Sequence, residues 1–128
     1  MATIKSYTDL EQSKKLAEIL PLESADMIIV YIGDREGVVT TTMPKETFNM
    51  LRTPFTDVRN TISCWSLAAL LNVLPYPSLA QHANGLWSLV AWVDTVEPYS
   101  VGDSVCGYDN EIDACVAMIE KLHELKIL

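Results

Sequence analysis

The spacing of apolar residues changes along the chain, and each spacing predicts one kind of element. Residues 6–20 carry apolar side chains at near-helical intervals up to Pro21, with Thr8 placed as the N-cap and Glu11 placed to complete a capping box. The run MIIVYI at 27–32 is short and rich in β-branched residues, and GDREG separates it from VVTTT. We therefore predict one helix followed by two strands that a turn connects.

The middle of the chain has a weaker pattern. Pro44 suits the first turn of a short helix, PKETFNMLR, that ends before the Thr53-Pro54 pair, whereas the next stretch, FTDVRNTIS, follows no clear period. Ser66 then occupies an N-cap position, and the helix predicted after it ends at Pro75. The apolar stripe of this helix consists of Leu67, Leu70, Leu71 and Leu74.

A hairpin is the clearest local signal in the second half of the chain. Residues 75–77, Pro-Tyr-Pro, are expected to form an extended connector. The segments SLAQHA and LWSLVAWV then flank the pair Asn84-Gly85, which favours a type I′ turn. Large apolar residues stand on both faces of the second segment, so we expect a strand that is central or covered on both sides. A further strand is predicted over residues 99–106.

The chain ends in a pattern typical of an amphipathic helix that Asp109 or Asn110 caps. Its apolar face is predicted to consist of Ile112, Cys115, Val116, Ile119, Leu122 and Leu125. Helices mixed with hairpins predict an α+β fold, with an antiparallel sheet built from hairpins and helices packed mainly on one face, in two layers. A length of 128 residues suits one domain, which we expect to span residues 1–128.

The charge of the chain narrows the choice of partners. Seventeen acidic and nine basic side chains give a formal charge of −8, which repels phosphate backbones and anionic membranes. The N-terminal residues lack the apolar core of a secretory signal, and no window approaches eighteen uncharged apolar residues. We therefore expect a cytoplasmic protein that binds neither nucleic acid nor a membrane.

The three cysteines do not fit a metal site or a disulfide framework. Cys64, Cys106 and Cys115 form no CxxC pair and leave one thiol over, so free thiols are expected. The two histidines lie far apart in the sequence, and the acidic residues do not follow an EF-hand pattern. No metal and no cofactor are predicted.

Cys64 is the one candidate nucleophile, and His82 is its candidate partner. A thiol near a helix N-terminus has a lowered pKa, and an imidazole in the following hairpin would complete a Cys–His pair. However, Cys64 precedes the predicted cap by two residues and adjoins Trp65, and free cysteine is one of the most buried residue types. We favour a core role for Cys64. His123 is similarly interpreted as structural.

Three segments of the chain carry a resemblance to a known group of proteins. They are SYTDLEQSKKLAEILPLESADM (6–27), CWSLAALLNVLPYPSL (64–79) and DACVAMIEKLHEL (113–125). Together they resemble a family of small uncharacterised proteins from gut anaerobes, often encoded by prophages or other mobile elements. The shared positions are helix faces, caps and proline stops, so the resemblance implies a common order of elements and no particular activity or catalytic residue.

These observations lead to three hypotheses about function. We favour a non-catalytic interaction protein, an accessory protein of a mobile element or prophage, that contacts another protein or a second copy of itself. Trp87, Trp92 and Tyr99 are the candidate interface residues, because large aromatic side chains anchor many interfaces. One alternative is an acidic inhibitor that mimics nucleic acid, suggested by the charge. The other is a thiol-dependent enzyme that uses Cys64 and His82.

Overall fold

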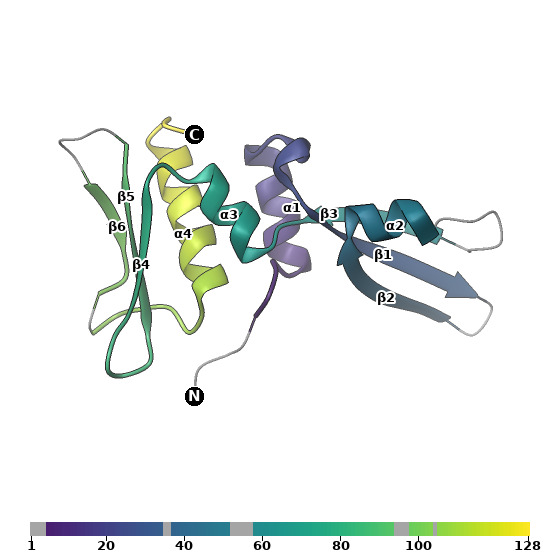
Figure 1. Ribbon diagram of the computed structural model, residues 1–128, viewed down its shortest axis with the longest axis horizontal. Coiled ribbons are helices and arrows are strands. Elements are labelled where there is room, and N and C mark those ends of the chain that lie inside the picture. The colour runs from purple at the N-terminus through teal and green to yellow at the C-terminus, as the bar shows by residue number, and fades with distance from the viewer. Residues whose placement is uncertain (1–4, 35–36, 52–57, 94–97, 104) are drawn as a thin grey trace.

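Figure 1 shows the computed structural model of the chain, which describes residues 5–34, 37–51, 58–93, 98–103 and 105–128. One antiparallel sheet consists of β1 (Met27–Asp34), β2 (Gly37–Pro44) and β3 (Val58–Cys64), in the order β2-β1-β3. A second antiparallel sheet consists of β4 (Pro77–Gln81), β5 (Trp87–Trp92) and β6 (Pro98–Val101), in the order β4-β5-β6. The helices are α1 (Leu10–Ile19), α2 (Lys45–Leu51), α3 (Leu67–Val73) and α4 (Glu111–Glu124), with a short 3-10 helix, η1 (Leu22–Ser24).

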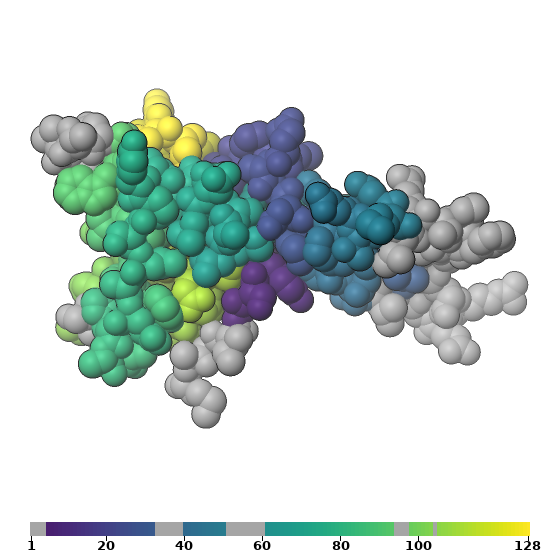
Figure 2. All heavy atoms as spheres, in the orientation of Figure 1, coloured from purple at the N-terminus to yellow at the C-terminus, as the bar shows by residue number. Residues whose placement is uncertain are grey.

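The predicted α+β class with antiparallel hairpins is confirmed, and the strands are shared between two sheets. The sheets lie at opposite ends of an elongated molecule, with α1, α3 and α4 between them (Figure 1). The space-filling view in Figure 2 shows the first sheet and α2 as a lobe that projects from the rest. The assignment of residues 1–128 to one domain stays a prediction.

The main hydrophobic core lies between the second sheet and the helices. It is built from buried side chains of α1, α3, α4, β5 and β6, among which Leu89 and Met118 are fully buried. The apolar face predicted for the last helix is buried up to Leu122, but Leu125 follows the helix and is 49% exposed. Ile28, Ile29 and Val30 of β1 are buried outside this core. The first sheet therefore buries apolar residues apart from the main core.

The start of α1 differs from the prediction by one residue. Asp9 is the N-cap, and it forms a reciprocal capping box with Gln12. The predicted box of Thr8 and Glu11 is wrong, because the Thr8 side chain is fully buried and committed elsewhere. Its hydroxyl accepts a hydrogen bond from the Trp65 backbone N–H at 3.1 Å and pairs with the Ser13 hydroxyl at 2.8 Å.

The stretch without a clear period forms β3, which pairs with β1 on the side opposite to β2. The β1–β2 register runs without interruption from Met27 opposite Pro44 to Asp34 opposite Gly37. The β1–β3 register instead shifts between Tyr31 and Ile32. Local sequence does not predict β3, because its pairing partner lies some thirty residues earlier in the chain.

Ser66 caps α3 as predicted, and it also ties the first sheet to this helix. Its hydroxyl oxygen accepts a hydrogen bond from the Ala69 N–H at 3.3 Å. The Ser66 backbone N–H and hydroxyl both donate to the Asp26 carboxylate, just before β1. The cap of the last helix is Asn110, which accepts from the Asp113 N–H at 2.8 Å.

The hairpin between β4 and β5 forms at the predicted place with a different turn. The Gly85 N–H donates to the His82 carbonyl at 2.9 Å, and Gly85 has a φ of +86° while Asn84 has a negative φ. This is a three-residue loop with glycine in the left-handed position, so the predicted type I′ turn is wrong. The β5 strand is central in its sheet, as expected.

The strand predicted over residues 99–106 is shorter than expected. β6 ends at Val101, and the backbone then turns through Gly102, whose φ is +74°. The Asp103 carboxylate accepts hydrogen bonds from the Val105 and Cys106 N–H groups at 2.8 and 2.7 Å. Such a local side-chain turn competes with a strand, which explains the early end of β6.

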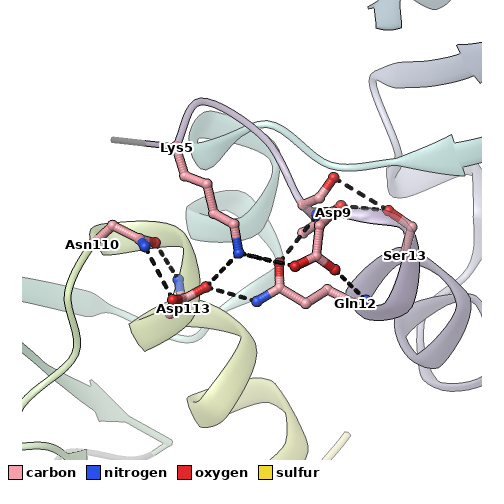
Figure 3. A network of polar contacts seen from close by, with 7 residues as sticks. Lys5, Asp9, Gln12, Ser13, Asn110 and Asp113 are labelled. Carbon is pink, nitrogen blue, oxygen red and sulfur yellow. Dashed lines mark hydrogen bonds and ion pairs between the residues drawn. The ribbon is translucent and has the colours of Figure 1, made fainter. Parts of the chain in front are cut away.

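A polar network joins the N-termini of α1 and α4 (Figure 3). Lys5 lies between Asp113, at 2.8 Å, and Asp9, at 3.0 Å, while the Gln12 amide donates to Asp113 at 2.8 Å. Burial opposes the charged forms, but the hydrogen bonds and charges outweigh it. They raise the pKa of Lys5 and lower the pKa values of Asp9 and Asp113. The network therefore stabilises the contact between two helices that are distant in the sequence.

Candidate interaction surface

The structure places Cys64 in the interior. Cys64 and Trp65 are fully buried, and the Trp65 indole N–H donates to the Ser24 hydroxyl at 2.9 Å. Burial, together with the negative charge of Asp26, raises the pKa of Cys64 to about 11. The His82 imidazole bonds instead to the Ser88 hydroxyl at 3.0 Å, within its own hairpin. These contacts support the core interpretation of Cys64 and count against a Cys64–His82 nucleophile.

The structure also places the other two cysteines and the second histidine. Cys115 is buried on α4, and burial raises its pKa to about 12, whereas Cys106 is exposed. Within the described ranges, no group of three or more His, Cys, Asp or Glu side chains has the geometry to hold a metal ion. His123 is exposed, and its ring nitrogen lies 2.9 Å from the Leu128 carbonyl oxygen.

A shallow groove of about 300 Å³ lies between α1 and α4. Its lining residues are Lys15, Glu18, Ile19, Glu120, His123 and Glu124. The groove is open to solvent, and Lys15 pairs with Glu120 across it at 4.0 Å. Both of these side chains are well exposed, so the pair is strongly screened and the groove resembles a solvated helix surface.

The structure exposes one of the three predicted interface aromatics. Trp87 and Tyr99 are partly buried and pack against the main core, while Trp92 is 39% exposed. The reason is the alternation of β5: Leu89 and Ala91 point into the core, so Trp92 points to the opposite face. Residue type therefore predicted three interface residues, and the strand register leaves only Trp92 of these three exposed for contact with a partner.

Sequence reasoning missed the most exposed aromatic side chain of this region. Tyr76 is 80% exposed and directly follows Pro75, whose carbonyl accepts a hydrogen bond from the Trp92 N–H at 3.1 Å. On the other side, Trp92 pairs with the exposed Pro98 of β6. Val93, 37% exposed, follows Trp92. We call Tyr76, Trp92, Val93 and Pro98 the aromatic end of the second sheet.

The backbone at Tyr76 is strained, and the predicted extended connector is therefore wrong at this residue. Tyr76 has a φ of +42°, and among the described non-glycine residues only Lys126, after the last helix, also has a positive φ. The chain must reverse direction between α3 and β4, but the flanking Pro75 and Pro77 have φ fixed near −65°. The reversal falls on Tyr76, although a residue before proline prefers an extended backbone.

Comparison of the chain with protein-family models, curated proteins and solved structures finds no significant match in any of the three. The resemblance to proteins of gut anaerobes and their mobile elements accordingly stays a prediction. Among the helices that the structure describes, none is both long and apolar enough to cross a bilayer.

Proposed function

We propose that this protein is a non-catalytic interaction module that binds another protein through the aromatic end of its second sheet. The observation that carries the proposal is Tyr76, which is 80% exposed in a strained backbone conformation and lies beside the exposed Trp92. A glycine would adopt this conformation without strain, so a tyrosine here is unfavourable for folding alone. Strain of this kind clusters at binding sites, where the function requires the side chain.

The chemistry of the surface indicates what kind of partner fits it. Tyr and Trp are the side chains that most often dominate binding energy at protein interfaces. The four described residues of the aromatic end are uncharged, whereas the whole chain carries a charge of −8. A complementary partner would insert apolar side chains at the centre and place basic residues at the rim, where the overall field attracts them.

The cysteines and the resemblance to proteins of mobile elements bear on the cellular compartment and the biological role. The free thiols of Cys64, Cys106 and Cys115 suit a reducing compartment, so we propose the cytoplasm. A role as accessory protein of a mobile element is what the resemblance implies. The acidic mimic is less favoured, because Asp9, Asp113 and Glu120 pair with lysines and the acidic residues are spread over several elements.

The test compares the wild type with Tyr76→Ala and Trp92→Ala. The control is Val105→Ala, which truncates an equally apolar side chain, 78% exposed, in the loop after β6. Proteins captured from the organism that encodes the chain are quantified first, and the enriched partner is then purified and titrated. We expect each aromatic substitution to weaken binding about tenfold or more, and the control to leave it unchanged.

Two results would overturn the proposal. One is a purified partner that binds wild type and both aromatic variants equally well. The other is a captured set of proteins that does not differ between the wild type and a Tyr76→Ala/Trp92→Ala double variant.

A further inference from the structure

The edge strands of the two sheets differ in how well they are protected against pairing with another chain. Among the described strands, β4 and β6 border the second sheet, and β2 and β3 border the first. β4 has five residues and begins with Pro77, and β6 has four residues and begins with Pro98. β3 contains Arg59, and its pairing with β1 is irregular. Short length, proline, charge and irregular pairing are all features that discourage edge-to-edge association.

β2 has none of these features before its last residue. It is eight residues long, its sequence GVVTTTMP contains no charged residue, and its only proline is the terminal Pro44. Its register with β1 is continuous over all eight pairs. Figure 1 shows β2 at the border of the first sheet, with β1 on its inner side. Its outer backbone N–H and C=O groups therefore form a regular template for a further strand.

We propose that a second copy of this chain pairs with β2, antiparallel and about a two-fold axis, so that the two first sheets become one six-stranded sheet. Two identical strands match each other in this arrangement, because every outward N–H of one meets an outward C=O of the other. Outward-facing backbone groups recur at every second residue, so this pairing requires one residue to lie opposite its own copy. An axis at Thr41 meets this condition over residues 38–44 and places Thr40 of one copy opposite Thr42 of the other. The side chains of Thr40 and Thr41 are both exposed. Paired threonines across strands are favourable, and this strand brings no like charges together.

Self-complementarity is the reason for choosing a second copy at this edge, and the lack of charge in β2 removes an obstacle to it. A chain with a charge of −8 repels its own copy over most of its surface, and an uncharged strand is where that repulsion opposes contact least. This surface is distinct from the aromatic end, which belongs to the other sheet, so neither proposal depends on the other. Edge pairing buries little surface, and we expect a weak, concentration-dependent dimer.

The test is sedimentation equilibrium over a wide concentration range, with variants that place a lysine on the edge. Thr41→Lys and Thr40→Lys put the lysine on opposite faces of β2, and Ser78→Lys is the control on the exposed face of β4. All three make the same change in net charge and reduce the general repulsion. We expect the two threonine variants to weaken the dimer about tenfold or more and the control to leave it unchanged.

A second measurement locates the contact. Amide hydrogen exchange of the wild type is compared at a low and a high protein concentration, and we expect slower exchange at high concentration in residues 37–44 only. A wild type that stays monomeric up to millimolar concentration overturns the proposal. This holds even if β2 is then found to bind an extended peptide of another protein. A dimer that Tyr76→Ala abolishes and Thr41→Lys does not would equally overturn it.

Discussion

Each end of this molecule carries a three-stranded antiparallel sheet, but the two sheets bury their apolar side chains in different surroundings. The second sheet packs one face on α4 and contributes Leu89 and Ala91 to the main core. The first sheet buries Ile28, Ile29 and Val30 of β1 outside that core. A difference in buried apolar area implies a difference in local stability, because local unfolding requires less free energy where fewer apolar contacts are lost.

The ends also differ in what they leave accessible. The second sheet has short edges that begin with proline, and it exposes Tyr76 and Trp92 at one end. The first sheet has a long uncharged edge in β2. The comparison teaches that one chain offers two kinds of contact, one through side chains and one through the backbone.

The largest effect on the stability of the protein is expected from truncating a side chain in the main core. Leu89→Ala removes a fully buried side chain and should destabilise the protein toward the upper end of the roughly 2–5 kcal/mol typical of such changes. Ile29→Ala, in the first sheet, should cost less within the same range. Chemical denaturation measures both values, and hydrogen exchange shows where they act.

The exchange pattern can contradict this view of the two ends. We expect Leu89→Ala to accelerate exchange in α1, α3 and α4, and Ile29→Ala to accelerate it mainly in α2, β1, β2 and β3. Equal acceleration throughout the chain by Ile29→Ala would mean that the two sheets unfold as one cooperative unit.

A smaller effect is expected from the polar network that holds α1 against α4. Lys5→Met keeps the length of the side chain but removes the bonds to Asp9 and Asp113, at an expected cost of about 1–2 kcal/mol near neutral pH. Lys5 and Asp113 are 23% and 31% exposed, which keeps solvent screening moderate, while Asp9 is 48% exposed and contributes less.

The pH dependence of this effect follows from the pKa shifts. The pKa values of Asp9 and Asp113 are lowered in the folded protein, so their contribution is present above the ordinary carboxyl pKa and is lost as the pH falls through the folded values. The pKa of Lys5 is raised, so its contribution is present below the ordinary lysine pKa and is lost as the pH rises through the folded value. The destabilisation by Lys5→Met should therefore shrink below about pH 4. A cost that is constant from pH 7 to pH 2 would show that the network does not act through charge.

The smallest effect on stability is expected at Tyr76, and its sign is opposite. Tyr76→Gly relieves the strain of a positive φ, partly offset by the greater freedom of glycine in the unfolded chain, for a net gain of about 0.5–1 kcal/mol. The same substitution removes the most exposed aromatic side chain of the proposed surface, so partner binding should weaken. Tyr76→Ala separates the two effects, because it removes the ring and retains the strain. A loss of stability in Tyr76→Gly would show that the tyrosine is retained for folding.

Local patterns alone predicted the elements whose signals lie within a few residues of each other. Ser66 as the cap of α3, the hairpin around Gly85 and the apolar face of α4 up to Leu122 all follow from neighbouring residues, because caps, turns and helix periodicity act over one or two turns of chain. The α+β class follows from the same patterns.

Tertiary structure decided the features that depend on distant partners. β3 forms because β1 offers it an edge, and Thr8 gives up the cap position because its hydroxyl bonds to Trp65 across the fold. Burial of Trp87 and exposure of Trp92 depend on which face of β5 meets α4, and the strained turn at Tyr76 depends on where β4 must pair. Apolar character makes the burial of a residue favourable, but strand register and packing decide which of the apolar residues are buried. The surfaces by which this protein makes contacts belong to that second kind of information.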